Sequence, residues 1–278
     1  VHVGTQSPLE VLQKGMIVQS GNGATIAVAE KVGGTEQAFA GIMNSYAKQL
    51  GMKNSNFENS SGLPGPTHRM SARDIATLAH AMIAEFPEYY RWYALREFEW
   101  NGIKQQNRNG LLGRDPSVDG IKTGHTESAG YCLATSAERN GMRLISAVLG
   151  TKSMKAREDA SAALLNYGYT FYETVALKKK GDVLLSPRVY KGEVEMIPAV
   201  VARDVWATVP RGSAASLVTT TSLNEPLIAP LTAAQTIGQV SITDGTNTVA
   251  TVPLVPQQAV AEGGWWSQLS DTVSLWMR

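Results

Sequence analysis

The sequence predicts an α+β domain, then a smaller all-β domain and a terminal helix. Three patterns support this fold class. Apolar residues recur at helical spacing through the N-terminal third and again over residues 153–172. Between these regions, alternating apolar and polar residues indicate strands. From about residue 182 onward, short strand-like runs alternate with Pro, Gly and Asn. We therefore expect domains at 1–174 and 175–262, followed by a helix within 263–278.

The composition is that of a globular protein, with 43% hydrophobic and 18% charged residues among 278. A net charge of +1 provides no electrostatic basis for nucleic-acid binding. Cys132 is the only cysteine, so an intrachain disulfide is excluded, and its apolar neighbours predict a buried side chain rather than a reactive thiol. The four histidines are scattered, so we expect no metal and no other cofactor. No segment approaches the ~20 apolar residues of a membrane span.

Three helices are predicted near the N-terminus. The first covers residues 7–19, with Ser7 as its N-cap and Pro8 at its first helical position. Residues 22–32 form a second, largely buried helix. Thr35 caps the third.

A loop rich in Gly, Pro, Ser and Asn follows at residues 57–70. Ser71 caps the next helix, over residues 71–86. Asn140 and Gly141 form the turn between two neighbouring strands. The strands predicted in this domain span residues 97–101, 130–138 and 142–150.

The second domain is predicted to be a small β sandwich. Asp244-Gly245 is a hairpin signal between two of its strands. Residues 174–181, with three consecutive lysines, are predicted to be a solvated linker. The predicted strands span residues 183–190, 194–201, 204–209, 215–222, 237–243 and 247–255.

The C-terminal segment after Gly263-Gly264 is amphipathic. We expect a helix lying at a membrane surface, because tryptophan combines an apolar body with a polar N–H. The alternative is a helix packed on the β domain. The apolar face comprises Trp265, Trp266, Leu269, Val273, Trp276 and Met277, and the opposite face comprises Ser267, Gln268, Ser270, Asp271 and Ser274.

Two short motifs indicate chemistry. Ser20-Gly21-Asn22 lies between two predicted helices, and Lys122-Thr123-Gly124 precedes a predicted strand 102 residues from Ser20. Each motif alone is weak, since Ser20 also suits a helix N-cap and Lys122 a solvated turn. Together and in this order, they resemble the second and third motifs of the penicillin-binding proteins and serine β-lactamases.

Longer strings resemble one branch of that group, the low-molecular-mass D-alanyl-D-alanine carboxypeptidases. The strings are NSYAKQLGM (44–52), GLPGPTHRMSARDIA (62–76), VDGIKTGHTESAGYCL (118–133) and MRLISAVLG with KAREDA (142–150 and 155–160). The resemblance implies a transpeptidase-like domain, with helices packed on an antiparallel sheet. It also implies a serine enzyme that removes the terminal D-Ala from peptidoglycan pentapeptides and is acylated by β-lactams. Such an enzyme works in the periplasm, attached to the outer face of the bacterial inner membrane.

The resemblance also implies roles for individual residues. Ser20 and Lys122 would relay protons to the departing D-Ala, and Asn22 would hold a substrate amide group. The backbone N–H of His125 would form half of the oxyanion hole.

A second set of residues would bind the substrate. Thr123 and Arg157 would bind its terminal carboxylate, because a guanidinium can donate two parallel charged hydrogen bonds to a carboxylate. Taken alone, Arg157 also suits a charge on a helix surface. Gly124 would let the substrate approach the strand edge, and Arg108 would line the cleft.

The sequence departs from the family at its first motif, S-x-x-K, which supplies the nucleophile. No S-x-x-K precedes Ser20, and Gly23 stands where the family often has Asp. Ser45 and Lys48 form such a string, but they follow S-x-N and lie in a predicted ordinary helix. We therefore expect a fragment of a longer chain, and expect residues 1–278 alone to be inactive.

Two other functions are weighed against this one. A non-catalytic protein could use the same cleft to bind D-Ala-D-Ala ends, without a nucleophile. A β-lactamase would need a carboxylate to activate water, commonly in E-x-x-x-N. Glu58 lies in the predicted loop, but the fourth residue after it is Gly62.

Reading the coding sequence before Val1 distinguishes the enzyme from the binding protein. We expect an in-frame S-x-x-K within a helical pattern a few dozen residues upstream, and a signal peptide before it. A start codon or signal-cleavage site directly before Val1 would instead favour the binding protein.

Overall fold

The computed structural model describes residues 4–277 and divides the chain into two compact units, Val1–Tyr169 and Thr170–Arg278. Residues 1–3 and Arg278, which the predicted domain and helix ranges include, lie outside the described residues. Helices and strands occur in the predicted order, so the α+β fold class followed by a β-rich region is confirmed.

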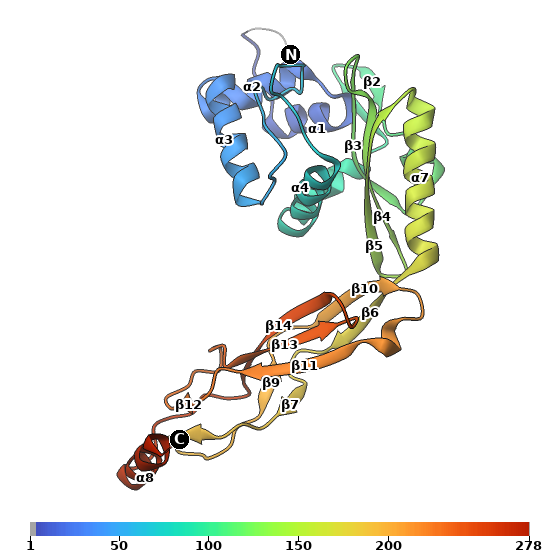
Figure 1. Cartoon of the computed structure of the whole chain (residues 1–278). Coiled ribbons are helices and arrows are strands. Elements are labelled where there is room, and N and C mark those ends of the chain that lie inside the picture. Colours follow the sequence, from blue (N-terminus) through green and yellow to red (C-terminus); the bar gives the residue numbers. More distant parts are fainter. Residues whose placement is uncertain (1–3, 278) are drawn as a thin grey trace. The chain divides into compact units, whose positions relative to one another are not determined.

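The first unit has a three-stranded antiparallel sheet of order β3-β4-β5 among its described residues. Figure 1 shows α7 on one face of this sheet and the other long helices on the opposite side. The elements up to residue 171 are α1 (Leu9–Gln19), α2 (Asn22–Gly33), α3 (Glu36–Gln49), α4 (Ala72–Glu85), α5 (Pro87–Tyr90), a 3-10 turn (Arg91–Ala94), β1 (Glu97–Trp100), β2 (Ile103–Gln106), α6 (Leu111–Arg114), β3 (Val118–Thr126), β4 (Gly130–Arg139), β5 (Met142–Thr151) and α7 (Met154–Phe171).

Alternation along the strands supplies a core on each face of this sheet. Leu133 of β4 packs with Leu165 of α7 on one face. The next residue, Ala134, packs on the other face with a cluster that includes Ala79 of α4. Because successive strand side chains point to opposite faces, one sheet joins α4 to α7.

The helix caps partly follow the sequence. Thr35 Oγ1 accepts a hydrogen bond from the Ala38 N–H at 3.1 Å, and Ser71 Oγ accepts one from Asp74, so both predicted caps are confirmed. The prediction for the first helix was wrong: Pro8 occupies the N-cap position and the helix begins at Leu9, without a side-chain cap bond.

Two burial predictions are corrected. The helix α2 is only partly buried, with Ala24 and Ala29 fully inside, because its other face is exposed. Cys132 is half-buried rather than fully buried.

One strand prediction of the first unit is confirmed and another is corrected. The hairpin at Asn140-Gly141 is confirmed, with both residues at positive φ as its turn requires. Lys122-Thr123-Gly124 was expected before a strand but lies inside β3. The Gly- and Asp-containing sequence of β3 has weak strand propensity, and pairing with β4 overrides it.

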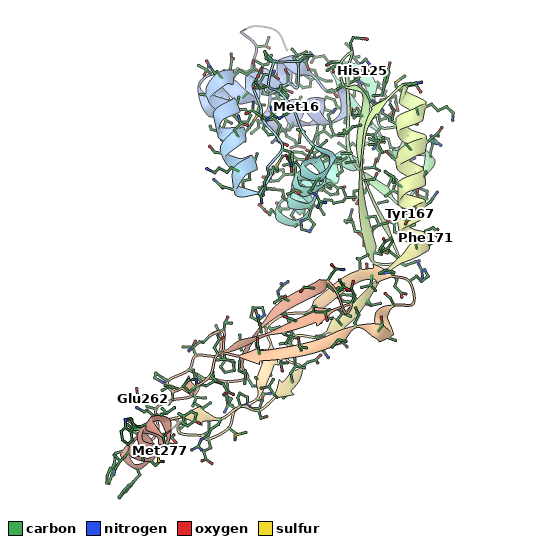
Figure 2. All side chains as sticks on the ribbon, viewed as in Figure 1. Met16, His125, Tyr167, Phe171, Glu262 and Met277 are labelled. Carbon is green, nitrogen blue, oxygen red and sulfur yellow. The ribbon has the colours of Figure 1, made fainter. Side chains whose placement is uncertain are left out.

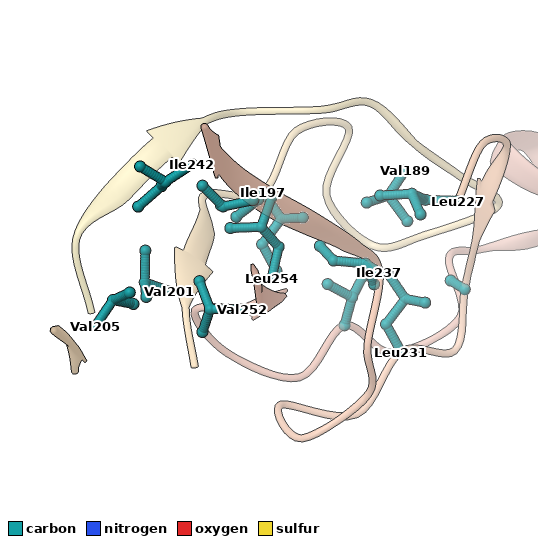
Figure 3. Close-up of a cluster of buried hydrophobic side chains, with 14 residues drawn as sticks. Val189, Ile197, Val201, Val205, Leu227, Leu231, Ile237, Ile242, Val252 and Leu254 are labelled. Carbon is teal, nitrogen blue, oxygen red and sulfur yellow. The ribbon is translucent and has the colours of Figure 1, made fainter. Parts of the chain in front are cut away.

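The second unit is β-rich. Its main sheet has the order β11-β13-β14-β9-β7, and its core is one cluster of buried aliphatic side chains (Figure 3). The elements are β6 (Tyr172–Lys178), β7 (Val183–Leu185), β8 (Val189–Tyr190), β9 (Ala199–Val201), β10 (Val205–Pro210), a 3-10 turn (Ala214–Ser216), β11 (Val218–Leu223), β12 (Leu227–Ile228), β13 (Gly238–Thr243), β14 (Thr248–Pro256) and α8 (Trp265–Trp276).

The predicted linker at 174–181 is wrong for most of its length. Residues Tyr172–Lys178 form β6, which pairs antiparallel with β10. The three consecutive lysines were interpreted as a solvated linker, but the first of them, Lys178, ends β6. Only residues 179 and 180 of the run lie beyond the strand. The hairpin at Asp244-Gly245 is confirmed between β13 and β14.

The terminal helix is confirmed as α8. Within residues 4–277, no helix is both long enough and apolar enough to cross a bilayer.

The packing of α7 on the sheet should set the stability of the first unit. Leu165 is 1% exposed, whereas its neighbour Leu164 is 50% exposed. We expect Leu165→Ala to lower the free energy of unfolding by about 2–5 kcal/mol, because it leaves a cavity. Leu164→Ala is the matched control and should change it by less than about 0.5 kcal/mol. Urea denaturation measures both, and equal losses would contradict this packing.

Candidate active site

Ser20 lies where the chain turns from α1 into α2. It is the C-cap of α1, in the left-handed conformation with φ of 56°, so it is not the helix N-cap that the motif alone also allowed. Its N–H donates to Met16 O at 3.1 Å, and the Gly21 N–H donates to Gly15 O at 3.2 Å. A left-handed serine is strained, and such strain is concentrated at functional sites. The turn places the Ser20 hydroxyl beside β3.

Lys122 reaches this hydroxyl from the sheet. Its Nζ donates a hydrogen bond to Ser20 Oγ and another to the backbone carbonyl of Thr123 at 3.0 Å. Among the described strands, β3 pairs only with β4, so its other edge is open. The contact joins the two motifs across 102 residues of chain.

The environment of Lys122 makes its ammonium group easier to deprotonate than that of an ordinary lysine. Burial, together with the positive charges of Arg108 and Arg157, lowers the pKa of Lys122 to about 8. A lysine tuned in this way can hold or release a proton near neutral pH.

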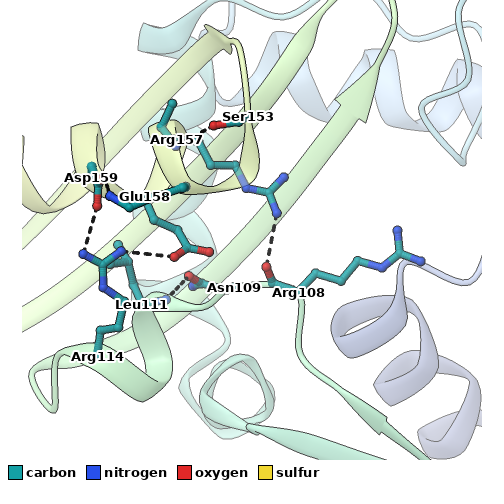
Figure 4. Close-up of polar contacts among 10 residues, drawn as sticks. Arg108, Asn109, Leu111, Arg114, Ser153, Arg157, Glu158 and Asp159 are labelled. Carbon is teal, nitrogen blue, oxygen red and sulfur yellow. Dashed lines mark hydrogen bonds and ion pairs between the residues drawn. The ribbon is translucent and has the colours of Figure 1, made fainter.

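Arg157 lies in the first turn of α7 and is only 2% exposed, so it is not a charge on the helix surface. One terminal nitrogen donates to Gly124 O at 3.3 Å and the other to Arg108 O at 3.1 Å (Figure 4). Its Nε is buried and lacks a hydrogen-bond partner among the described residues. Burial also lowers the pKa of Arg157, although the charge of Glu158 opposes this effect.

Unlike Arg157, whose side chain is buried, Arg108 has a side chain that points into solvent. Its carbonyl faces Arg157, whereas its side chain extends away from Arg157 in Figure 4 and is exposed. This places a solvated guanidinium near Lys122, whose pKa is lowered by the Arg108 charge.

Asn109 is a positioning residue that sequence reasoning missed. It is buried, and its Nδ2 donates to Gly120 O at 3.2 Å while its Oδ1 accepts from the Leu111 N–H at 3.2 Å. These bonds tie the Arg108 loop to β3. Its place next to Arg108 in the string QNRNGLL was the available signal.

The remaining predicted site residues lie along β3 and at the start of α2. Asn22 is the first residue of α2 and is exposed. Thr123 is buried, whereas Gly124 and His125 are exposed, and the His125 ring lies 4.0 Å from that of Tyr131.

Gly124 has no packing reason to be glycine. A Cβ added there would lie 3.7 Å from Cys132 Cβ, an ordinary contact. Unobstructed access to the strand is therefore a better reason for glycine at this position.

Other candidates lie outside this cluster. Ser45 and Lys48 are exposed on α3, and the Ser45 hydroxyl donates to Gly41 O at 3.1 Å. Glu58 accepts hydrogen bonds from Thr67 within its loop, and these bonds lower the pKa of its carboxyl. The described part of the chain contains no group of three or more His, Cys, Asp or Glu that could hold a metal ion.

Comparisons with known proteins match both units. The family described as D-alanyl-D-alanine carboxypeptidase matches residues 1–153, and the C-terminal domain of penicillin-binding protein 5 matches residues 172–262. D-alanyl-D-alanine carboxypeptidase DacA of Escherichia coli strain K12 is 41% identical over 274 residues, which are 98% of this chain and 68% of that relative. D-alanyl-D-alanine carboxypeptidase DacF of Bacillus subtilis strain 168 is 30% identical over 281 residues, and the match covers 99% of this chain and 72% of that relative.

Solved structures agree. The crystal structure of penicillin-binding protein 5 from Haemophilus influenzae has a TM-score of 0.85 at 38% identity, covering 94% of this chain and 77% of that one. The carboxypeptidase DacD of Francisella tularensis has a TM-score of 0.71 at 33% identity, with the same coverage. A family match over more than half of the chain, together with relatives along nearly all of it, shows that this chain belongs to the D-alanyl-D-alanine carboxypeptidase family.

Proposed function

We propose that the complete protein is a serine-type carboxypeptidase that removes the terminal D-Ala from peptidoglycan pentapeptides through an acyl-enzyme, and that β-lactams acylate it. One observation carries this proposal: the contact between Lys122 Nζ and Ser20 Oγ, with the lysine pKa near 8. Acyl transfer to a serine needs a group that can pass a proton to the departing amine.

The proton relay follows from this contact. A lysine with a pKa of about 8 is neutral in about one molecule in ten at pH 7. The Ser20 hydroxyl can donate its proton to the nitrogen of the departing D-Ala, while the Lys122 ammonium returns a proton to Ser20 Oγ and is left as the neutral amine. Asn22, at the start of α2, would hold a substrate amide, and the N–H of His125 would face the developing oxyanion.

Positive charge at the site suits a substrate that ends in a carboxylate. Arg108 supplies an exposed guanidinium, Arg157 a buried one behind β3, and Thr123 a hydroxyl between them in sequence. A terminal carboxylate beside these groups would offset their mutual repulsion. This preference for a free carboxyl end would make the enzyme an exopeptidase.

The nucleophile is not among residues 1–278 in this proposal, because no S-x-x-K precedes Ser20.

We also propose that α8 binds a membrane surface, which would hold the protein in the periplasm at the outer face of the inner membrane. Most of its apolar residues are exposed, up to 89% for Trp276, and only Leu275 is half-buried. Residues 265–276 contain no Lys or Arg, so burial of tryptophan and aliphatic groups is the driving force.

The pKa of Lys122 is directly measurable. In ¹³C-methylated protein, the resonance missing from Lys122→Arg identifies this lysine, and NMR titration should give a pKa of about 8. Arg108→Ala should raise that pKa, because it removes a like charge. Arg114→Ala is the control, because Arg114 is paired with Glu158 and Asp159. Titration like an ordinary exposed lysine would contradict the proposed relay.

Hydrolysis of a peptide ending in D-Ala-D-Ala tests the enzyme. The complete protein should release D-Ala, and residues 1–278 alone should release none and bind no radiolabelled penicillin covalently. In the complete protein, Arg157→Ala should lower kcat/KM about 10- to 100-fold for the peptide and less for penicillin acylation. Unchanged peptide hydrolysis would remove Arg157 from the site, and a complete protein that binds the peptide without cleaving it would favour the binding function.

Flotation with vesicles tests the membrane contact. The chain of 278 residues should float with phosphatidylethanolamine/phosphatidylglycerol vesicles, whereas a chain ending at Glu262 should stay in the dense fraction, because it lacks α8. Equal flotation of both chains would exclude α8 as the membrane-binding element.

A further inference from the structure

The helix α8 is attached to the β-rich unit through its polar face. Ordinary surface helices bury their apolar face and expose their polar one. Here the arrangement is largely reversed, because Asp271 is 5% exposed whereas the apolar side chains other than the half-buried Leu275 are exposed. Figure 2 labels Glu262 before the start of this helix and Met277 after its last residue. The exposed apolar residues are Trp265, Trp266, Leu269, Val273, Trp276 and Met277.

Asp271 makes the central contacts of this attachment. Its Oδ1 accepts a hydrogen bond from Arg188 at 2.9 Å, and its Oδ2 accepts one from the backbone N–H of Lys191 at 2.5 Å. A carboxylate that is taken out of water needs such partners, and both belong to the segment that contains β8. Lys191 itself has a φ of 60°, a left-handed conformation that is unfavourable for lysine. The strained backbone turns its N–H toward α8.

The chain entering α8 is held by the same segment. The Gly263 N–H donates to Lys191 O at 2.8 Å, and the Ser267 hydroxyl donates to Gly192 O at 3.1 Å. Gly263 must be glycine, because an added Cβ would lie 2.4 Å from Gly192 O. Contacts at Gly263, Ser267 and Asp271 span two turns of helix, which prevents α8 from rotating about its axis.

We propose that Asp271 is a positioning residue: it locks α8 onto the β-rich unit so that the tryptophan face meets the lipid surface in one fixed orientation. This inference rests on the proposed membrane contact of α8. The unit therefore stands on the bilayer as a rigid extension of the inserted helix, rather than on a flexible tether. Membrane affinity comes from the apolar face, and orientation comes from Asp271.

Two matched variants separate these roles. Asp271→Asn retains the shape of the side chain but removes the charge that pairs with Arg188. It should speed hydrogen exchange of the α8 amides at least tenfold without lipid and leave vesicle affinity within about threefold. Trp276→Ala should do the reverse, weakening flotation on phosphatidylethanolamine/phosphatidylglycerol vesicles while α8 stays protected. Ser274→Ala is the control for both, because the Ser274 hydroxyl donates to Ser270 O of its own helix and has no other hydrogen bond within residues 4–277.

Orientation is read by energy transfer. A donor dye on Thr246→Cys, an exposed turn residue, is paired with acceptor-labelled lipid in a Cys132→Ala background. The bound parent should give one narrow distribution of transfer efficiency, and Asp271→Asn a broad one. Arg188→Gln should also broaden the distribution. A variant that carries both Asp271→Asn and Arg188→Gln should broaden it little more than either substitution alone, because each substitution removes the same contact between the two side chains.

The outcomes are distinguishable. Unchanged exchange and an unchanged narrow distribution in Asp271→Asn, with the parent bound to vesicles, would overturn the positioning role alone. A parent that does not float would overturn the membrane contact and the positioning role with it.

Discussion

The antiparallel pairing of β3 with β4 is the constraint on which the candidate site depends. This register places Lys122 opposite Ala134 and Gly124 opposite Cys132. With β4 on one side, β3 has no strand on its other edge among the described residues, and Lys122 of β3 donates a hydrogen bond to Ser20. A slip of one residue would move every β3 side chain to the opposite face and break this contact. The two faces of the sheet, packed on α7 and α4, prevent such a slip.

Positive charge accumulates around this edge. Arg157 is anchored by the carbonyls of Gly124 and Arg108, so it braces the β3 edge against the Arg108 loop. Burial of Lys122 lowers its pKa, and the like charges of the exposed Arg108 and the buried Arg157 act in the same direction. An anionic substrate end would be favoured there, and its arrival would shift Lys122 back toward its charged form. The position of the buried Arg157 therefore affects the pKa of Lys122 through electrostatics.

The chain uses amphipathic helices in two ways. In α4, apolar side chains including Ala79 pack against the sheet, which is the ordinary arrangement. In α8, a buried carboxylate and the close approach of Gly263 to Gly192 attach the polar face, and most of the apolar face is left exposed. Exposed apolar area of this kind is unfavourable in water, so it indicates a surface made for another phase or partner. The two helices differ in which face carries the attachment to the protein.

Local signals in the sequence determined the fold class, the caps at Thr35 and Ser71, and the turns at Asn140-Gly141 and Asp244-Gly245, since each depends on neighbours in the chain. The motifs also pointed to Ser20 and Lys122, but only through resemblance. Tertiary structure alone decided that Lys122 lies inside a strand, that Arg157 is buried, and that residues 172–178 pair with β10. It also decided that Asp271 faces the protein rather than water. These features depend on partners tens of residues away, and no local periodicity encodes the distance between such groups.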